Sequence, residues 1–211
     1  MLVAIIDTGV MSGFFPVGPI ALDMEVTPAG LVRHRKSTIR SFHGTMVAAI
    51  LKQYSYDCQI CSIKVFDDDT ETATCRMLCS ALRWCLCKNI PFINVSAGCL
   101  EPSEFKKIGR IIQSLHTNKQ TVIAAYERNN MPVMPAGHEA AIGVKTDPSL
   151  HDGEYFFDTK SSKRDYVASS QHKLHFLTGG DTIITAPATS FAAPLVTAVL
   201  VNDAIKHRTS G

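Results

Sequence analysis

The sequence lacks any apolar run long enough to cross a membrane. Its longest apolar stretches, such as residues 195–201, are far shorter than the roughly 20 residues that a spanning helix needs. It also lacks the basic segment and small-residue cleavage site of a secretory signal, because Met1 leads directly into the apolar run 2–6. These absences predict no membrane partner and a cytoplasmic location.

An excess of charge of either sign is also absent. The chain of 211 residues carries 21 Lys and Arg against 19 Asp and Glu, which leaves a formal charge of +2. This balance argues against a surface that binds nucleic acid, so we expect no nucleic-acid partner. The length fits one ordinary domain with a sizeable core, and we expect residues 1–211 to form it.

The seven cysteines are an odd number in a chain without an export signal, which predicts free thiols in a reducing compartment. The close pairs Cys58/Cys61 and Cys75/Cys79 leave a zinc site open, but small buried cysteines are the favoured interpretation. The acidic residues 67–69 are read as an exposed turn in preference to a calcium site. We therefore expect no metal and no cofactor.

Short apolar runs alternate with amphipathic helical patterns along most of the chain, which predicts an α/β fold with three layers and a mostly parallel central sheet. Residues 11–40 are rich in glycine and proline and are expected to be mostly loop, with one short extended piece near residues 30–33. The strands are expected at residues 2–6, 59–66, 91–95, 121–125, 140–144, 166–168 and 174–177, and the helices at 43–53, 71–88, 103–117 and 190–207.

Residues 188–194 (Ala-Thr-Ser-Phe-Ala-Ala-Pro) have the form of a serine nucleophile at the start of a helix. Ser190 falls in the first turn, where unpaired N–H groups and the positive helix end stabilise an oxyanion. The small side chains of Ala192 and Ala193 let the helix approach a sheet closely, and Pro194 is tolerated in a first turn. This segment suits acyl transfer.

Two earlier segments supply the partners that a serine nucleophile needs. Asp7 ends the first predicted strand and His43 opens a helix. A serine hydroxyl becomes a good nucleophile when an imidazole accepts its proton, and a carboxylate on the other ring nitrogen orients that imidazole. Each residue alone also fits an ordinary turn or helix cap, so the prediction depends on all three together.

These segments resemble the subtilisin-like serine proteases, in which Asp, His and Ser follow in this order. Residues 93–98 (Ile-Asn-Val-Ser-Ala-Gly) are similar to that family's substrate-binding edge. The resemblance covers about residues 2–201 and implies a subtilisin-like fold in a compact intracellular form without a propeptide. It also implies a peptide or protein substrate, bound in extended conformation by main-chain hydrogen bonds to Ser96, Ala97 and Gly98.

The chain departs from the family in its oxyanion loop. Relatives place Gly-Asn directly after an Ala-Ala pair, whereas residues 126–130 read Tyr-Glu-Arg-Asn-Asn. A carboxylate at the strict position would repel an oxyanion, so we expect Asn129 to be the donor, with Asn130 as the alternative. Phe42 and Ala188 also stand where relatives commonly carry glycine, and a narrower cleft is one expected consequence.

The sequence thus predicts a serine endopeptidase that forms an acyl-enzyme on Ser190 and removes the leader of a small precursor peptide. The alternative is a catalytically impaired protein of the same fold that captures extended peptides along residues 96–98 without cutting them. A weaker third hypothesis is a scaffold regulated through thiols or zinc. Cys99 follows the predicted cleft edge, which leaves open a thiol that lines a substrate pocket or is sensitive to oxidation.

Overall fold

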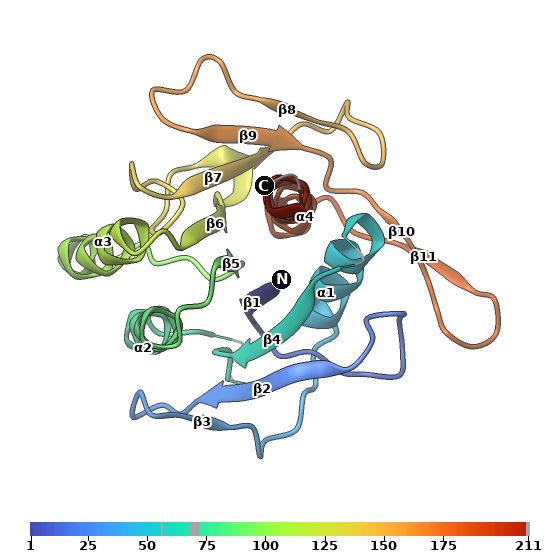
Figure 1. Ribbon diagram of the computed structural model, residues 1–211, viewed down its shortest axis with the longest axis horizontal. Helices are drawn as coiled ribbons and strands as arrows, with labels where there is room; N and C mark the ends of the chain where they lie inside the picture. The colour runs from blue at the N-terminus through green and yellow to red at the C-terminus, as the bar shows by residue number, and fades with distance from the viewer. Residues whose placement is uncertain (56, 68–71, 210–211) are drawn as a thin grey trace.

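The computed structural model describes residues 1–55, 57–67 and 72–209. Its central sheet has the strand order β3-β2-β4-β1-β5-β6-β7-β9-β8, and a separate hairpin is formed by β10 and β11 (Figure 1). The strands are β1 (Leu2–Asp7), β2 (Ile20–Val26), β3 (Val32–His34), β4 (Gln59–Lys64), β5 (Phe92–Val95), β6 (Thr121–Ala125), β7 (Ile142–Thr146), β8 (Tyr155–Phe157), β9 (Asp165–Ala168), β10 (Lys173–His175) and β11 (Thr182–Ile184). Within the described residues, the pairs inside the central sheet are parallel and those of the outermost strands β3 and β8 are antiparallel.

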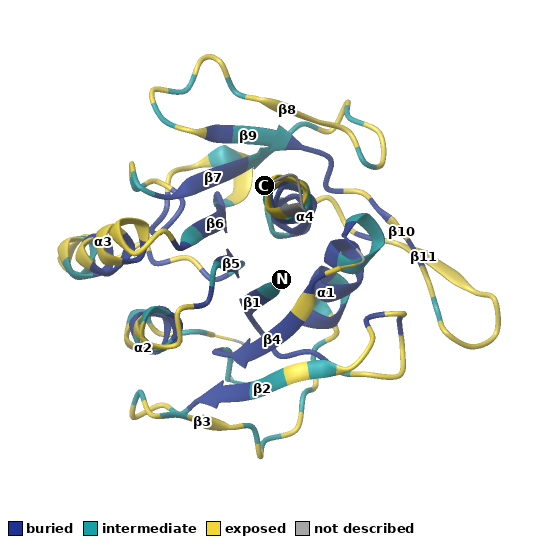
Figure 2. Cartoon of the chain, viewed as in Figure 1, coloured by how far each residue is buried: buried dark blue, intermediate teal, exposed yellow. Residues whose placement is uncertain are grey.

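Four long helices cover the two faces of this sheet. They are α1 (His43–Tyr54), α2 (Cys75–Cys87), α3 (Pro102–Thr117) and α4 (Thr189–Thr209), and a 3₁₀ turn, η1, spans Arg128–Asn130. The helices α2 and α3 pack on one face and α1 and α4 on the other, each pair over its own apolar cluster (Figure 1). Figure 2 shows that burial is concentrated in the sheet and in the helix faces turned toward it. The predicted three-layer α/β fold is confirmed.

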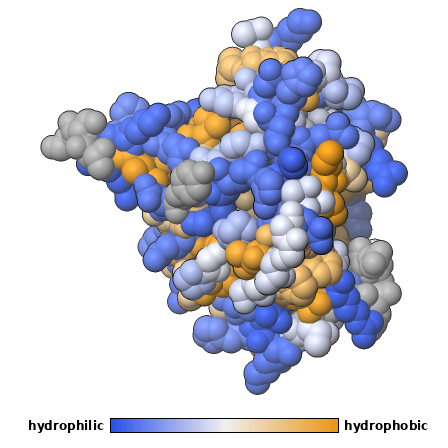
Figure 3. All heavy atoms as spheres, turned by 90° about the vertical axis from the view of Figure 1, so that its right-hand side faces the viewer, coloured by the Kyte–Doolittle hydropathy of each residue, from blue (hydrophilic) through white to orange (hydrophobic). Residues whose placement is uncertain are grey.

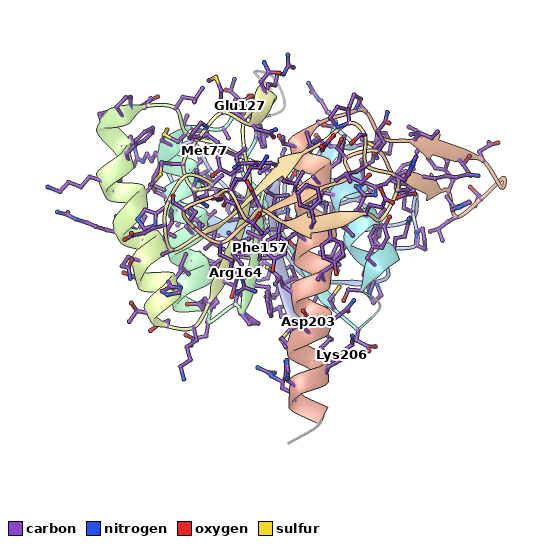
Figure 4. All side chains as sticks on the ribbon, turned by 90° about the horizontal axis from the view of Figure 1, so that it is seen from above. Met77, Glu127, Phe157, Arg164, Asp203 and Lys206 are labelled. Carbon is purple, nitrogen blue, oxygen red and sulfur yellow. A yellow bond between two sulfur atoms is a disulfide. The ribbon has the colours of Figure 1, made fainter. Side chains whose placement is uncertain are left out.

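The carboxyl ends of the parallel strands meet at one edge of the sheet. β1 lies between β4 and β5 in parallel register, with Asp7 opposite Lys64 and Ile6 opposite Val95. Figure 4 shows the two ends of the molecule: Glu127, just after β6, lies at one end, and Asp203 and Lys206 lie near the far end of α4. The first turn of α4 and the loops after β1, β5 and β6 therefore come together at one end, where open α/β sheets hold their sites.

Residues 11–40 are mostly loop, as predicted, but they also contain β2, a strand that was not predicted. β2 pairs in parallel with β4 and antiparallel with β3, so it lies within the sheet. Its sequence alternates, with Met24 and Val26 buried in the core cluster below the sheet. The glycines and prolines of this region lie outside β2 and mark its turns. Apolar and polar residues alternate in residues 20–26, which is typical of a strand. The prediction missed this strand because it relied on the glycines and prolines of the surrounding residues.

A second correction concerns the cysteines. Cys75 and Cys99 form a disulfide with a Cα–Cα distance of 5.6 Å, so the expectation of free thiols is wrong for this pair. Cys99 is buried and presents no thiol to a substrate pocket. The free cysteines among the described residues are Cys58, Cys61, Cys79, Cys85 and Cys87. Burial raises the pKa of Cys61 to about 12, which keeps it in the unreactive thiol form.

The start of α2 also differs from the prediction. The helix begins at Cys75, later than the expected residue 71, because Thr74 is its N-cap and its Oγ1 accepts the N–H of Met77 at 3.2 Å. Among the described residues, no three His, Cys, Asp or Glu side chains are grouped so that they could hold a metal ion. Asp68 and Asp69 of the acidic turn lie outside the described residues. No helix in the described part of the chain is both long and apolar enough to span a bilayer.

Candidate active site

Asp7 and His43 meet where β1 ends and α1 begins. The Oδ1 atom of Asp7 lies 2.7 Å from Nδ1 of His43 and accepts the N–H of Thr8 at 2.6 Å. The hydroxyl of Thr8 in turn accepts the N–H of Gly44 at 3.0 Å. A Cβ atom on Gly44 would lie 2.5 Å from the carbonyl oxygen of Gly9 and 3.1 Å from Asp7 Oδ1. Glycine after His43 is therefore what lets the helix approach the end of the strand so closely.

The two side chains shift each other's pKa. Burial alone would raise the pKa of Asp7, but the charge and hydrogen bond of His43, with smaller contributions from Ser96 and Thr8, bring it below its usual value. Burial likewise would lower the pKa of His43, and the Asp7 carboxylate raises it above 6.5. Asp7 is thus ionised at neutral pH, and its charge favours the imidazolium that would form when His43 accepts a proton.

Ser190 lies on the other side of the imidazole. Its Oγ is 2.8 Å from Nε2 of His43, so the three side chains form one hydrogen-bonded chain. Ser190 is the second residue of α4, where its N–H has no helical acceptor. The hydroxyl of Thr189 donates to the carbonyl oxygen of Tyr126 at 2.5 Å, which ties the start of the helix to the end of β6. The ring of Phe191 packs against that of His43 at 4.8 Å between centroids.

The predicted substrate edge follows β5. Ser96 lines the same cleft as His43 and Ser190, whereas Ala97 is buried and Gly98 is exposed. The residue that follows this edge, Cys99, is fixed by two backbone hydrogen bonds to Met134, at 2.8 and 3.1 Å, and by its disulfide to Cys75. The structure therefore brings Ser96 to the cleft beside Ser190 and keeps the backbone of residues 97–98 in a fixed position next to it.

The two asparagines of the expected oxyanion loop have different environments. Both have left-handed backbone angles, with φ of 57°. The amide of Asn130 donates to the carbonyl oxygen of Thr146 at 3.1 Å and accepts its N–H at 3.0 Å, so it is used in holding the loop to β7. Asn129 is exposed and lines the cleft with Ser190. Of the two, Asn129 is the side chain available to a substrate oxygen.

Replacing each asparagine with glycine, which also tolerates a left-handed backbone, is expected to separate their roles. Asn129→Gly should lower kcat for peptide hydrolysis by about 10²–10³-fold, the loss seen when subtilisin itself loses its oxyanion asparagine. Asn130→Gly should instead lower the free energy of unfolding by about 1–3 kcal/mol, because two backbone groups of Thr146 lose their partner. Steady-state kinetics and denaturant unfolding of both variants test this; the reverse pattern would assign the donor to Asn130.

The cleft that joins these residues has a volume of about 1110 Å³. Its floor and walls come from the ends of β1, β5 and β6, the start of α1 and the first turn of α4. Charged side chains of both signs line it: Arg40, Asp67, Glu127 and Arg128. A space of this size accommodates several residues of an extended peptide.

A cluster of side chains around the buried residue His172 was not predicted from the sequence. His172 is fully buried, and its Nε2 lies 3.0 Å from both the carbonyl oxygen of Ser169 and that of Phe191. Its Nδ1 lies 2.8 Å from Asp152 Oδ1 and 3.1 Å from the hydroxyl of Tyr54, which also donates to Asp152. His172 thereby connects the end of α1 to the first turn of α4, next to Ser190.

Replacing His172 with phenylalanine is expected to lower the free energy of unfolding by about 3 kcal/mol, because two carbonyl groups lose their donor in a site without solvent. His116→Phe, on the exposed side of α3, is the matched control and should change stability by less than about 0.5 kcal/mol. Denaturant unfolding measures both. Equal stability of the two variants would show that His172 does not hold the start of α4.

The fold is similar to those of several proteases whose structures have been solved. The prenylagaramide maturation protease PagA superimposes with a TM-score of 0.65 and 23% identity, over 94% of this chain and 73% of PagA. The protease domain of PatA gives a TM-score of 0.70 and 20% identity, over 98% of this chain and 81% of that chain. The epidermin leader peptide processing serine protease EpiP from Staphylococcus aureus gives 0.69 and 18%, over 95% of this chain and 64% of EpiP.

Comparison of the sequence alone gives no such match. No protein-family model and no curated protein matches it. At 18–23% identity, this likeness shows how the chain is folded. The likeness covers nearly the whole chain, including the sheet and the helices that carry Asp7, His43 and Ser190. The chain has a subtilisin-like fold.

Proposed function

We propose that the protein is a serine endopeptidase in which Ser190 is the nucleophile, His43 the general base and Asp7 the residue that orients His43. The observation that carries this proposal is the continuous chain of hydrogen bonds from Asp7 Oδ1 through His43 to Ser190 Oγ, at 2.7 and 2.8 Å. These distances lie within the reach that proton transfer needs. Burial of Asp7 supports the role, because its carboxylate is held away from solvent by His43 and the N–H of Thr8.

In the first half of the reaction, Nε2 of His43 accepts the hydroxyl proton as Ser190 Oγ attacks the carbonyl carbon of the peptide bond. The negative charge on the carbonyl oxygen is stabilised by the N–H of Ser190 and the side chain of Asn129. His43 then gives the proton to the leaving amine, and the C–N bond breaks. An ester between the acyl group and Ser190 remains.

In the second half, a water molecule replaces the amine. It loses a proton to His43 as it attacks the ester carbon, and the collapse of this intermediate releases the carboxylic acid. The proton on His43 returns to Ser190 Oγ, which restores the starting state. Asp7 remains ionised throughout and stabilises the imidazolium in both halves.

The substrate that we propose is a precursor peptide from which a leader is removed. The names of PagA and EpiP describe maturation and leader processing, and both have this fold. An extended, flexible substrate fits the cleft, because the cleft is open and Ser96 lines it. The backbone after Ser96 is held in position by the hydrogen bonds between Cys99 and Met134. Such an enzyme cuts one exposed segment and leaves folded proteins intact.

The test is to incubate the purified protein with precursor peptides from its source genome and with an unrelated unfolded protein, and to identify the products by mass spectrometry. We expect one cut per precursor and slower, scattered cleavage of the unfolded protein. Ser190→Ala is the matched control and should give no product. A wild-type protein that cuts unfolded protein readily but no precursor would leave the protease assignment standing and contradict the leader-removal role.

One observation favours the alternative, a peptide-binding protein that does not cut. Glu127 lines the cleft near the oxyanion loop, and a carboxylate there opposes the development of negative charge on a substrate oxygen. Its Oε1 accepts the N–H of Arg128 at 3.1 Å, which directs part of its charge into the loop. Peptide binding by Ser190→Ala and wild type with equal affinity, and no turnover by wild type, would support this alternative.

A further inference from the structure

The chemistry of the proposed function determines which side of the cleft holds the segment that follows the scissile bond. The leaving amine must lie beside His43 Nε2 to receive its proton, and the acyl oxygen must lie toward Asn129. His43 is the first residue of α1, so the departing segment crosses the start of that helix. The acyl segment remains on the opposite side, against Ser96 at the end of β5.

An exposed apolar surface lies at the start of α1, and the proposed catalytic mechanism gives it no role. Phe42, which directly precedes His43, is 42% exposed, and its ring makes an edge contact with that of Phe14 at 4.8 Å. Phe14 is 41% exposed, and Leu177 beside it is 54% exposed. We call Phe14, Phe42 and Leu177 the apolar ledge. Figure 3 looks onto this side of the molecule, where apolar residues are gathered among hydrophilic ones.

The ledge is held in place by buried contacts below it. The N–H of Leu177 donates to the carbonyl oxygen of Phe14 at 2.9 Å, which joins the β10–β11 hairpin to the loop after β1. Phe15, which follows Phe14, and Phe176, which precedes Leu177, stack at 4.7 Å, and Phe15 is buried. The surface is therefore preformed, and little conformational entropy of these side chains would be lost when a ligand binds.

The ledge adjoins the cleft at Phe42. Ser41 and His43, on either side of Phe42, both line the cleft, as do residues 186–190 that follow β11. An exposed apolar surface beside a substrate cleft is typical of a recognition site.

We propose that the apolar ledge binds the one or two residues that follow the scissile bond, and that the enzyme therefore selects substrates with large apolar side chains there. This inference rests on the proposed endopeptidase function and names its substrate class: peptides whose released segment begins with residues such as Leu, Ile or Phe. The occupant is the substrate itself, because the path of the leaving amine leads onto this surface.

The experiment uses a library of peptides that share one sequence before the cleaved bond and vary at the two positions after it. We expect wild type to cleave peptides with Leu, Ile or Phe at these positions about tenfold faster in kcat/KM than those with Ser or Asp. Phe14→Ser and Phe42→Ser should each remove most of this preference, so that each variant cleaves the Leu, Ile and Phe peptides no more than about twofold faster than the Ser and Asp peptides. Phe156→Ser, a 47% exposed phenylalanine on the edge strand β8, is the matched control.

A fluorophosphonate probe, which labels an activated serine and does not reach beyond it, is applied to every variant. Phe42→Ser loses labelling if the substitution moves His43. In that case Leu177→Ser, which lies further from the start of α1, tests whether the ledge causes the preference for apolar residues. Cleavage of the library by wild type with no preference after the bond, or a preference that all ledge variants retain, would overturn the ledge assignment alone. Labelled wild type that cleaves no peptide would contradict the proposed function, and the ledge assignment with it.

Discussion

Ser190→Ala is expected to lower kcat for peptide hydrolysis about 10⁶-fold, the loss found in subtilisin when its nucleophile is removed. The physical reason is that His43 and Asp7 act only through the hydroxyl of Ser190, which lies 2.8 Å from His43 Nε2. Substrate binding should change little, because the wall at Ser96 and the loop at Asn129 remain. Single-turnover kinetics, with a separate measurement of peptide affinity, distinguish the two effects.

The matched control for this prediction is Ser169→Ala. Ser169 is a buried serine whose hydroxyl donates to the carbonyl oxygen of Gln171 at 3.2 Å, a partner outside the chain of hydrogen bonds from Asp7 to Ser190. We expect this variant to keep its activity within about a factor of three after correction for any unfolded fraction. Residual activity of Ser190→Ala above one part in a thousand would mean that a different group attacks the peptide bond.

Asp7→Asn is expected to lower kcat/KM about 10⁴-fold, the loss typical of replacing this carboxylate by an amide, which favours the wrong tautomer of the histidine. The pH dependence should change as well. In wild type, His43 must lose a proton to act as base, and Asp7 raises its pKa, so activity should rise with pH to a midpoint above 6.5. Without the carboxylate, burial of His43 is the remaining influence and lowers that midpoint below 6.5.

The measurement is the pH profile of kcat/KM for both proteins between pH 5 and 9, with circular dichroism at each pH to confirm folding. A midpoint that moves to lower pH in Asp7→Asn is the expected direction. A midpoint that is unchanged or moves higher would show that Asp7 does not interact with His43 in the working enzyme, whatever the loss in rate.

Much of the fold follows from local patterns in the sequence. Residues 2–6 and 121–125 are continuous apolar runs, and such runs have few alternatives to a buried parallel strand. The helices at 43–54 and 102–117 carry regular apolar faces and form close to the predicted bounds. The positions of Asp7, His43 and Ser190 could be predicted because each lies at the boundary of an element that the pattern defines well.

The features that the sequence did not predict depend on residues that are distant along the chain. Cys75 and Cys99 are 24 residues apart, and their pairing depends on where α2 begins relative to the end of β5. The cluster around His172 joins Asp152, in a loop, to the first turn of α4, and these segments are far apart along the chain. The two roles of Asn129 and Asn130 depend on which of two adjacent amides reaches Thr146, which no periodicity encodes.

The apolar ledge illustrates the same limit. The presence of Phe42 beside His43 is visible in the sequence and suggests a narrowed cleft. The structure instead shows its ring turned to Phe14 and part of an exposed surface, because the loop after β1 returns to the start of α1. The presence of an aromatic residue at position 42 can thus be seen in the sequence. Its proposed effect on substrate selection depends on the loop after β1 and on the β10–β11 hairpin, which the sequence pattern does not place.

The central claim is that His43, held by Asp7, activates the hydroxyl of Ser190, and labelling with a fluorophosphonate tests it most directly because no natural substrate is required. The mass of the intact wild-type protein should increase by one probe adduct, and peptide mapping should locate the adduct on Ser190. Labelling should be absent in Ser190→Ala and at least about 10³-fold slower in His43→Ala. A folded wild-type protein that takes up no probe, or a Ser190→Ala variant that labels as fast as wild type, would contradict the account.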